Sequence, residues 1–366
     1  MKSSAHSAAT FASPVGKFSE SEILRAFVPL LEEHNRWVGD QPGNLVEMTV
    51  GPGDDCSVLS VPASQLVFTT DTQTEGQDFR RQWNSGDTTT GYDVGWKAAT
   101  QNLADVVSMG ADPITLLVSL STPPDIPLQW LKDFARGLTD SCRKNGAERC
   151  SISGGDLGAS TEISVTVTAV GRCAGAPLLR SGAQVGDVVA IAGELGTAAA
   201  GFAVMEYSQG LSVDGLDARP EHILRAVQAQ QRPQTPMRNA LQAVGVAHAM
   251  MDISDGPVRD AQRIAQASKV SIHLETELFR ADIAQLEPVA DWLIARSEIQ
   301  EFSLSTATRW VLSGGENHGM LACFPADTPL PKGFRAVGRC ERAHPGSVFV
   351  DGKVPSDKGW DHFLAE

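Results

Sequence analysis

Aspartates recur in this sequence at glycine turns and beside hydroxyl residues, a pattern suited to phosphate chemistry. The motifs are GPGDD with Asp54 and Asp55, FTTDT with Asp71, NLADVVSMGA with Asp105, SGGDLG with Asp156, and MMDISDG with Asp252 and Asp255. Several carboxylates brought together destabilise a protein unless cations accompany them, because each buried ion costs several kcal/mol. Magnesium binds such oxygen ligands and is usually held together with substrate phosphates. The joint pattern therefore predicts a magnesium and phosphate site, to which neighbouring hydroxyl groups can contribute, namely those of Thr69, Thr70 and Ser254.

Each of these motifs also has a simpler interpretation. Gly-Asp-Asp at residues 53–55 is typical of a turn, because aspartate bonds its own backbone. Asp105 falls on the polar side of a predicted helix with Gln101 and Asn102, where it can be solvated. Asp255 can cap the helix that follows it, and SGGDLG can be a tight hairpin turn. Only the occurrence of all these motifs in one chain favours the metal site.

Other phosphate-binding and catalytic signatures do not occur in the sequence. There is no G-x-x-x-x-G-K-[ST] loop, and GELGTAAAG lacks both the lysine of that loop and the G-x-G-x-x-G order. No G-x-S-x-G, H-E-x-x-H or kinase H-R-D motif is found either. A nucleotide-using enzyme with this sequence would therefore bind phosphate through magnesium rather than through a lysine-bearing loop.

The composition indicates a globular protein of two domains. The chain has 366 residues, which is too long for one ordinary core, with 42% apolar and 20% charged residues. The net charge of −14 and the lack of a Lys/Arg run argue against a nucleic-acid partner. No apolar run approaches the roughly 20 residues that a membrane helix needs, so no membrane span is expected.

The first residues and the cysteines favour a cytoplasmic protein. The start, MKSSAHSAATFASPVG, is small and polar without an apolar core, which is typical of a loose tail rather than a secretory signal. The six cysteines form no Cys-x-x-Cys pair and no zinc-like spacing with histidine. We interpret them as reduced thiols, as expected in the cytoplasm.

Helix and strand patterns alternate along both halves of the chain, which predicts mixed α/β domains. Ser19 and Glu22 form a capping-box pattern at the start of a helix. A further helix is predicted over residues 93–110, with a core stripe of Trp96, Ala99, Leu103, Val106 and Val107. In the second half we expect helices at 221–231, from about 236, at 257–268 and at 285–297, and strands at AHAMMDIS, SIHLE, RWVLSG and GMLACF. We divide the chain into a tail (1–17), an N-terminal domain (18–180) and a C-terminal domain (181–366).

Taken together, the motifs resemble those of the thiamine-monophosphate kinase family. GPGDDCSVL, FTTDTQTEGQDF, VGWKAATQNLADVVSMGADP, GGDLG, LLRSGAQVGD, MDISDG, SGGENHG and GWDHF occur in that family's order, from about residue 15 to residue 366. The acidic motifs are shared with a wider superfamily that includes aminoimidazole ribonucleotide synthetase, selenophosphate synthetase and a hydrogenase-maturation protein. The early TEGxxF and the terminal GWDHF select the kinase family.

The resemblance implies a two-domain α/β fold with mixed α+β sheets, like that of aminoimidazole ribonucleotide synthetase. It also implies a homodimer whose N-terminal, metal- and ATP-binding domains pair through their sheets, and an active site in the cleft that the C-terminal domain completes. The implied magnesium ligands are Asp55, Thr69, Thr70, Asp71, Asp105, Asp156, Asp252 and Asp255, among which Asp71, Asp105 and Asp156 are the implied catalytic residues. The implied ATP contacts are Gly155, Asp156, Arg180 and Ser254, and the implied contacts to the thiamine moiety are Glu316 and Trp360.

Two positions depart from the family pattern. Asp78, an implied substrate-binding residue, stands where the family usually has a histidine that contacts thiamine phosphate, and Asn317 stands where the family has an aspartate. These changes bear on substrate binding more than on the type of reaction. Trp360 offers a flat face for a cationic heterocycle, although a tryptophan there can also anchor the C-terminus in the core.

The implied reaction transfers the γ-phosphoryl group of ATP to thiamine monophosphate, which gives thiamine diphosphate and ADP. The second pKa of the acceptor phosphate is near 6, so no general base is required. Catalysis then consists of positioning and of charge neutralisation by several magnesium ions. Three alternatives remain open: another ATP-using synthetase or cyclo-ligase of the superfamily, a protein that binds nucleotide or thiamine phosphate without turnover, and a two-metal phosphohydrolase.

Overall fold

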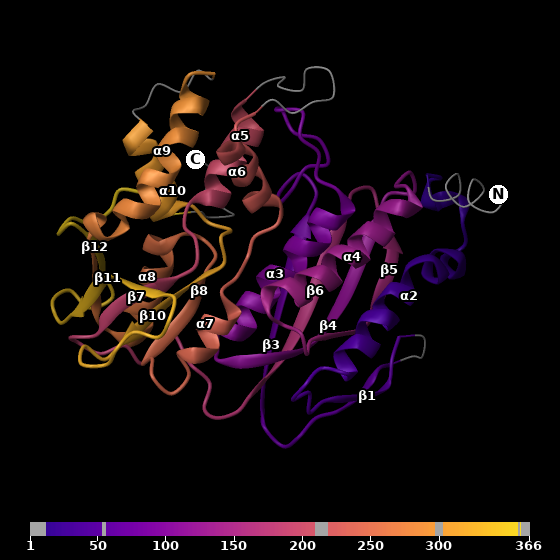
Figure 1. Cartoon of the computed structure of the whole chain (residues 1–366), viewed down its shortest axis with the longest axis horizontal. Coiled ribbons are helices and arrows are strands. Elements are labelled where there is room, and N and C mark those ends of the chain that lie inside the picture. The colour runs from indigo at the N-terminus through magenta and orange to yellow at the C-terminus, as the bar shows by residue number, and fades with distance from the viewer. Residues whose placement is uncertain (1–11, 53–55, 209–218, 297–302, 358, 360–366) are drawn as a thin grey trace. The chain divides into compact units, whose positions relative to one another are not determined.

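The structure is a computed structural model that describes residues 12–52, 56–208, 219–296, 303–357 and 359. The chain divides into two compact units (Figure 1). The first unit comprises residues 1–81, 88–106 and 111–175, and the second comprises residues 82–87, 107–110 and 176–366. The second unit therefore includes two short segments that come from the first half of the chain.

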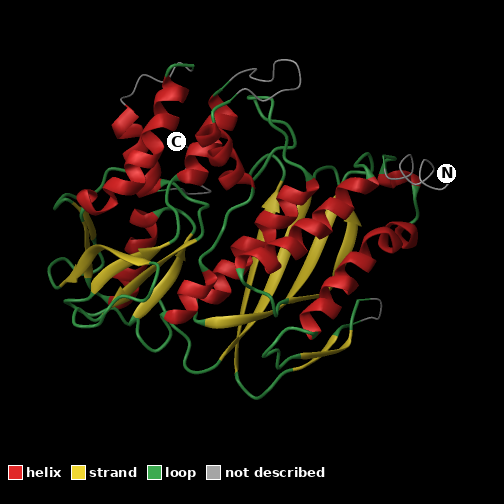
Figure 2. Cartoon of the chain, viewed as in Figure 1, coloured by secondary structure: helices red, strands yellow, loops and turns green. Residues whose placement is uncertain are grey.

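The first unit is built on a four-stranded sheet with the strand order β3-β6-β4-β5. These strands are β3 (Gln65–Thr74), β4 (Ala111–Thr122), β5 (Ser151–Ala159) and β6 (Ser164–Cys173). Strand β6 pairs antiparallel with β3 and β4, whereas β4 and β5 run parallel. Helices lie along one face of this sheet (Figure 2), namely α2 (Glu20–Gly39), α3 (Gly91–Ser108) and α4 (Leu128–Asn145). A 3-10 helix, η1 (Val15–Lys17), precedes α2, and a separate hairpin pairs β1 (Glu47–Val50) with β2 (Val58–Ser60).

Local sequence explains how these helices begin and pack. The predicted capping box is confirmed, since the Glu22 carboxylate accepts a hydrogen bond from the Ser19 N–H at 2.8 Å. Helices α3 and α4 approach so closely that a Cβ atom on Gly95 would lie 2.1 Å from the Phe134 carbonyl oxygen. This close approach buries the predicted stripe of α3, whose members Trp96, Ala99, Leu103, Val106 and Val107 are all at most 4% exposed.

The second unit contains a six-stranded sheet with the strand order β12-β9-β11-β7-β10-β8. Its strands are β7 (Val188–Ala192), β8 (Ala249–Ile253), β9 (Ser271–Leu274), β10 (Gly319–Phe324), β11 (Phe334–Glu341) and β12 (Val348–Val350). Neighbouring strands are antiparallel except β12 and β9. The helices are α5 (Thr197–Tyr207), α6 (Glu221–Gln231), α7 (Met237–Gln242), α8 (Pro257–Ser268), α9 (Arg280–Ile294) and α10 (Ser303–Ser313), with the 3-10 helix η2 (Thr276–Phe279) before α9. Every residue of β8 and β10 is buried, so both faces of these strands are covered.

The predicted mixed α/β architecture is confirmed, but some predicted elements are wrong. RWVLSG, predicted as a strand, forms the end of α10. The buried residues of this helix, Thr306, Ala307, Trp310 and Val311, recur at helical spacing, and the short apolar run in RWVLSG alone does not reveal that period. The helix predicted at 285–297 begins earlier, as α9. SGGDLG is not a hairpin turn, because it lies within β5.

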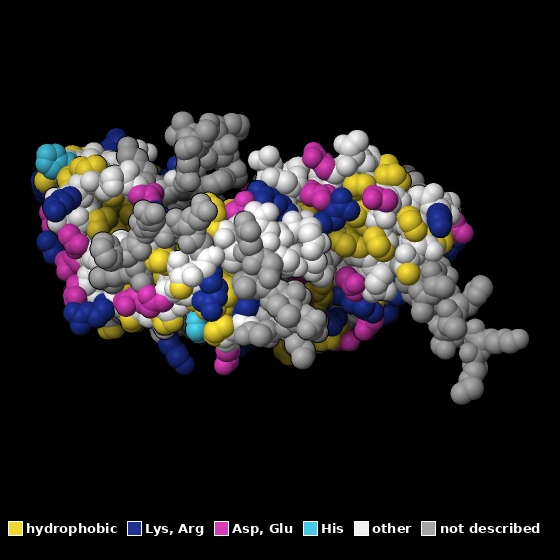
Figure 3. Space-filling view, turned by 90° about the horizontal axis from the view of Figure 1, so that it is seen from above, with side chains coloured by type: hydrophobic (Ala, Val, Ile, Leu, Met, Phe, Trp, Pro, Cys, Tyr) yellow, Lys and Arg dark blue, Asp and Glu magenta, His cyan; other side chains and the backbone are white. Residues whose placement is uncertain are grey.

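Three further features are the membrane-spanning potential of the described helices, the surface charge and the state of the cysteines. No helix among the described residues is long and apolar enough to cross a membrane. On the face shown in Figure 3, Lys and Arg side chains are interspersed with Asp and Glu side chains. All six cysteines are free thiols, and all but Cys56 are buried.

Candidate active site

A row of polar side chains joins β3 to α3 in the first unit. Thr69, Asp71 and Gln73 alternate along β3 and so lie on one face of the strand. Gln101 and Asp105 lie one turn apart on α3 and share a face of that helix. The Thr69 hydroxyl donates to the Asp105 carboxylate at 2.5 Å, and the Gln73 amide donates to the Gln101 side-chain oxygen at 2.7 Å. Asp71 lies between these two contacts. Three predicted residues, Thr69, Asp71 and Asp105, therefore lie along the same contact between β3 and α3, which we call the seam.

Thr70 lies on the other face of β3, as the alternation of a strand requires. Its hydroxyl donates to the Val167 carbonyl oxygen at 3.1 Å and accepts from the Thr168 hydroxyl at 3.1 Å. Both partners belong to β6, the neighbouring strand. The Thr70 side chain therefore points away from the seam that holds Asp71, and its role as a ligand stays a prediction.

Asp156 lies on β5, where the register aligns it with Ser119 of β4 and, through β6, with Thr72 of β3. This row occupies the face of the sheet opposite Asp71, and Asp156 is exposed there. Gly155 beside it must be glycine, because a Cβ atom would lie 1.8 Å from the Val118 carbonyl oxygen. The structure thus places Asp156 apart from the seam, and its catalytic role also stays a prediction.

Both departures from the family pattern have structural explanations. The Asp78 carboxylate accepts a hydrogen bond from the Thr74 N–H at 2.7 Å, which closes the turn after β3, and the Lys97 amine donates to the Asp78 carbonyl oxygen at 3.4 Å. The Asn317 side-chain oxygen accepts a hydrogen bond from the Ala198 N–H at 3.4 Å, in the first turn of α5. At each position, the side chain that differs from the family pattern accepts a hydrogen bond from a nearby backbone N–H.

The second unit gathers acidic side chains between the end of β8 and the start of α8. Asp252 is 3% exposed, and its carboxylate lies 3.4 Å from Nδ1 of His318. Asp255 follows in the turn, where its carboxylate contacts Arg263 at 2.5 Å and Arg259 at 3.6 Å. Asp255 is therefore more than a helix cap, because its carboxylate is held by cationic side chains of α8.

Asp260, on the first turn of α8, completes this group and was not predicted from the sequence. It is fully buried, accepts the Asp255 N–H at 3.1 Å and pairs with Arg263 at 2.5 Å. Burial, and next the charge of Asp252, raise the pKa of Asp260 to about 7, although Arg263 opposes the rise. Three carboxyl groups, those of Asp252, Asp255 and Asp260, thus lie around this turn together with the guanidinium groups of Arg259 and Arg263.

Glu316 occupies a strained loop between α10 and β10. Its φ of 65° lies in the left-handed region, which non-glycine residues rarely adopt, and His318 follows with a φ of 51°. The Glu316 N–H donates to the Ser254 carbonyl oxygen at 2.8 Å, and its carboxylate accepts from the Gln230 amide at 2.5 Å. The loop therefore ties two predicted site residues, Glu316 and Ser254, to each other and to α6.

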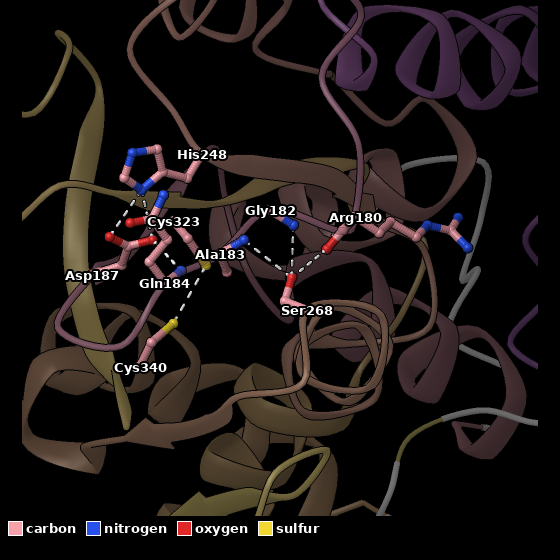
Figure 4. A network of polar contacts seen from close by, with 9 residues as sticks. All are labelled: Arg180, Gly182, Ala183, Gln184, Asp187, His248, Ser268, Cys323 and Cys340. Carbon is pink, nitrogen blue, oxygen red and sulfur yellow. Dashed lines mark hydrogen bonds and ion pairs between the residues drawn. The ribbon is translucent and has the colours of Figure 1, made fainter. Parts of the chain in front are cut away.

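Arg180 begins a segment whose backbone is fixed by a network of polar contacts (Figure 4). The Ser268 hydroxyl donates to the Arg180 carbonyl oxygen at 2.8 Å and accepts from the Gly182 N–H at 3.1 Å. Farther along, the Asp187 carboxylate lies 3.0 Å from Nδ1 of His248. The Arg180 guanidinium extends away from this network (Figure 4), so the predicted ATP-binding side chain is left available for a ligand.

Two predicted residues, Asp55 and Trp360, lie outside the described residues. Among the residues that are described, no three His, Cys, Asp or Glu side chains are arranged as a metal site. The donor chemistry nevertheless fits magnesium, because the group in the first unit presents carboxylate and hydroxyl oxygens and the group in the second unit presents carboxylate oxygens. Sequence reasoning missed Asp260 and Gln230, since each is a polar residue at a helix position that periodicity assigns to the core.

Domain-family models match both halves of this chain. Residues 53–173 match the N-terminal domain of AIR synthase related proteins, and residues 184–336 match the C-terminal domain of the same group. These two matches define a two-domain protein of the AIR synthase related class.

Similar proteins identify the family within this class. The thiamine-monophosphate kinase of Mycobacterium tuberculosis (strain H37Rv) is 36% identical over 318 residues, which are 86% of each chain. That of Corynebacterium glutamicum is 32% identical over 356 residues, or 95% of each chain. The solved structure of AaThiL from Aquifex aeolicus, complexed with AMPPCP and TMP, has a TM-score of 0.68 at 29% identity and covers 85% of this chain and 91% of its own. This chain belongs to the thiamine-monophosphate kinase family.

Proposed function

We propose that this protein transfers the γ-phosphoryl group of ATP to thiamine monophosphate, with magnesium, to form thiamine diphosphate and ADP. The observation that carries the proposal is the 36% identity with a thiamine-monophosphate kinase over 86% of the chain. AMPPCP is an analogue of ATP, and its presence with TMP in the AaThiL complex supports both substrates.

The main barrier to this reaction is the repulsion between two polyanions. Two unit charges about 4 Å apart repel each other by roughly 4 kcal/mol at intermediate dielectric. The acceptor phosphate has a second pKa near 6, so at neutral pH it is already a nucleophile. The protein therefore has to position the phosphates and neutralise their charge rather than remove a proton.

We propose magnesium ions as the neutralising charges. The oxygen donors that would hold them are those of Thr69, Asp71 and Asp105 in the first unit and of Asp252 and Asp255 in the second. After burial, the charge of Asp252 is the next cause of the raised pKa of Asp260, which supports the proposal because it shows that carboxylates lie close together at this turn. Bound magnesium would neutralise and orient the phosphates. The other residues proposed to contact cations or ATP are Asp55, Thr70, Gly155, Asp156, Arg180 and Ser254.

The proposed activity is tested with purified protein, ATP, thiamine monophosphate and magnesium. Thiamine diphosphate and ADP are expected in equal amounts by chromatography, and EDTA should abolish both. ADP release with a different acceptor would instead indicate another synthetase of the class, and phosphate release without any acceptor would indicate a hydrolase. Tight binding of thiamine monophosphate without ADP release would indicate a binding protein.

We also propose that the protein is a homodimer that pairs through the open face of the first unit's sheet. Phe68, Leu66 and Leu117 lie on this face and are 68%, 41% and 39% exposed. Contiguous exposed apolar side chains are uncommon on monomers and favour a protein partner. The second copy of this chain is the partner that the family resemblance implies.

We further propose that the protein works in the cytoplasm. The six free thiols support this location, since disulfides are rare there and common in secreted proteins. Cell fractionation that finds the protein among secreted proteins would contradict the proposal.

A further inference from the structure

Gln230 of α6 carries a buried amide whose hydrogen bonding is incomplete. The residue is 3% exposed, and its Nε2 atom donates to Oε2 of Glu316 at 2.5 Å. Its Oε1 atom is also buried, yet it accepts no hydrogen bond from any described residue. Leaving a buried acceptor without a donor costs free energy, so such an atom is expected to receive a donor from a bound water or from a ligand.

The orientation of the Gln230 amide is set by its partner. Glu316 is an acceptor when ionised, so the amide nitrogen must face it. The reversed amide would place two oxygen atoms 2.5 Å apart, and they would repel each other. The oxygen of Gln230 is therefore the atom that is left for another donor.

Glu316 is held in place from two sides. Its N–H donates to the Ser254 carbonyl oxygen at 2.8 Å, and its backbone keeps a φ of 65°. Strain of this kind persists where the surrounding structure maintains it, and it occurs preferentially at binding and catalytic sites. Gln230 on α6 and Glu316 in its hydrogen-bonded loop thus provide two neighbouring acceptor groups. Both residues belong to the second unit.

We propose that Gln230 and Glu316 form the subsite for the exocyclic amino group of the substrate's aminopyrimidine ring. This inference rests on the proposed function and deepens it, because it names Gln230 as a residue that determines specificity. An amino group on such a ring offers two N–H donors, which matches two acceptors side by side. The ring of thiamine monophosphate carries one amino group of this kind.

The subsite predicts discrimination against a close analogue. In oxythiamine monophosphate an oxygen replaces the amino group, so an acceptor would face the two acceptors of the protein. Sites built to bind a substrate N–H reject analogues that lack it, because the protein's own polar groups are then left unpaired. The wild-type protein should bind thiamine monophosphate at least about tenfold more tightly than oxythiamine monophosphate.

The test compares binding of the two compounds, in the presence of magnesium, by isothermal titration calorimetry. Gln230→Met keeps a side chain of similar length but removes the acceptor, so the preference should fall to about threefold or less. The ATP concentration needed for half-saturation of Gln230→Met should equal that of the wild type. Gln228→Met is the matched control, because Gln228 is exposed on the same helix, and this variant should keep the wild-type preference.

Three results would overturn the subsite. The first is a wild-type protein that binds both compounds equally well, and this result does not depend on any variant. The second is a Gln230→Met variant that loses affinity for both compounds alike, since that outcome means Gln230 only supports Glu316. The third is weakened ATP binding instead, which would assign the amide to adenine. Failure of the wild-type protein to form thiamine diphosphate would refute the proposed function, whereas the binding ratio tests the subsite without turnover.

Discussion

Asp260 sets the charge balance of the acidic turn in the second unit. Its side chain is fully buried and holds both the backbone of Asp255 and the guanidinium of Arg263. Burial and the nearby Asp252 carboxylate raise its pKa from 3.8 to about 7. The folded protein therefore keeps a proton on Asp260 at pH values where the unfolded chain has already lost it.

This shift predicts how stability depends on pH in magnesium-free protein. Between about pH 4 and pH 7 the folded state binds more protons than the unfolded state, so Asp260 makes the protein less stable as pH rises through this window. A shift of this size corresponds to roughly 4 kcal/mol. Asp260→Asn removes the titration, so its stability relative to the wild type should increase from pH 4 to pH 7. Urea unfolding in EDTA measures the difference, and parallel curves for the two proteins would contradict the prediction.

At the residue scale, the sequence motifs predicted the aspartates as candidate ligands but did not predict Gln230. Asp71, Asp105, Asp252 and Asp255 stand in glycine- and hydroxyl-rich motifs, and these motifs are visible in the chain. Gln230 could not be found in this way, because its position on α6 is a core position and only the fold shows that its partner is Glu316.

Helix α3 is the element that places Asp105 against Thr69, and its position depends on contact with α4. Gly95→Ala would put a Cβ atom 2.1 Å from the Phe134 carbonyl oxygen, so the two helices would have to separate. We expect the free energy of unfolding to fall by about 3 kcal/mol, as for other overpacked cores. Thermal unfolding measures this loss.

Gly39→Ala, at the end of α2, is the control for Gly95→Ala. A Cβ atom at Gly39 would meet nothing within 4 Å, so this change should be neutral or stabilise the protein by up to about 1 kcal/mol. If Gly95→Ala and Gly39→Ala changed the free energy of unfolding equally, the close contact between α3 and α4 would not be needed for stability.

At the element scale, periodicity predicted long helices well and short apolar runs poorly. The stripe of α3 extends over several turns, so its period is clear. RWVLSG is too short to show a period, and its aromatic and branched residues favoured a strand although it belongs to α10. Local patterns also do not reveal that Asn102 is fully buried although it was placed on the polar side of α3, since that depends on packing partners distant in the chain.

At the scale of the whole molecule, the open sheet face predicts the oligomeric state. Phe68 is 68% exposed, so Phe68→Asp should cost a monomer little, whereas it would place a charge in a dimer interface. Light scattering at micromolar concentration should give about twice the chain mass of 38.9 kDa for the wild type and the chain mass itself for Phe68→Asp.

Leu278→Asp provides the control for the dimer prediction. Leu278 is also an exposed apolar residue, at 41%, but it lies on η2 of the second unit. This variant should keep the wild-type mass. A Phe68→Asp variant that keeps the wild-type mass as well would rule out pairing through the sheet face.

We propose that aspartates of the acidic motifs hold the divalent cations that phosphoryl transfer to thiamine monophosphate needs. The most direct measurement is the magnesium dependence of thiamine diphosphate formation by Asp105→Asn and by Asp255→Asn, because each variant removes one charge and keeps the shape of the side chain. Each should lower kcat by about 100-fold or more and raise the magnesium concentration needed for half-maximal rate. If either variant kept the wild-type rate and the wild-type magnesium dependence, the claim would be wrong.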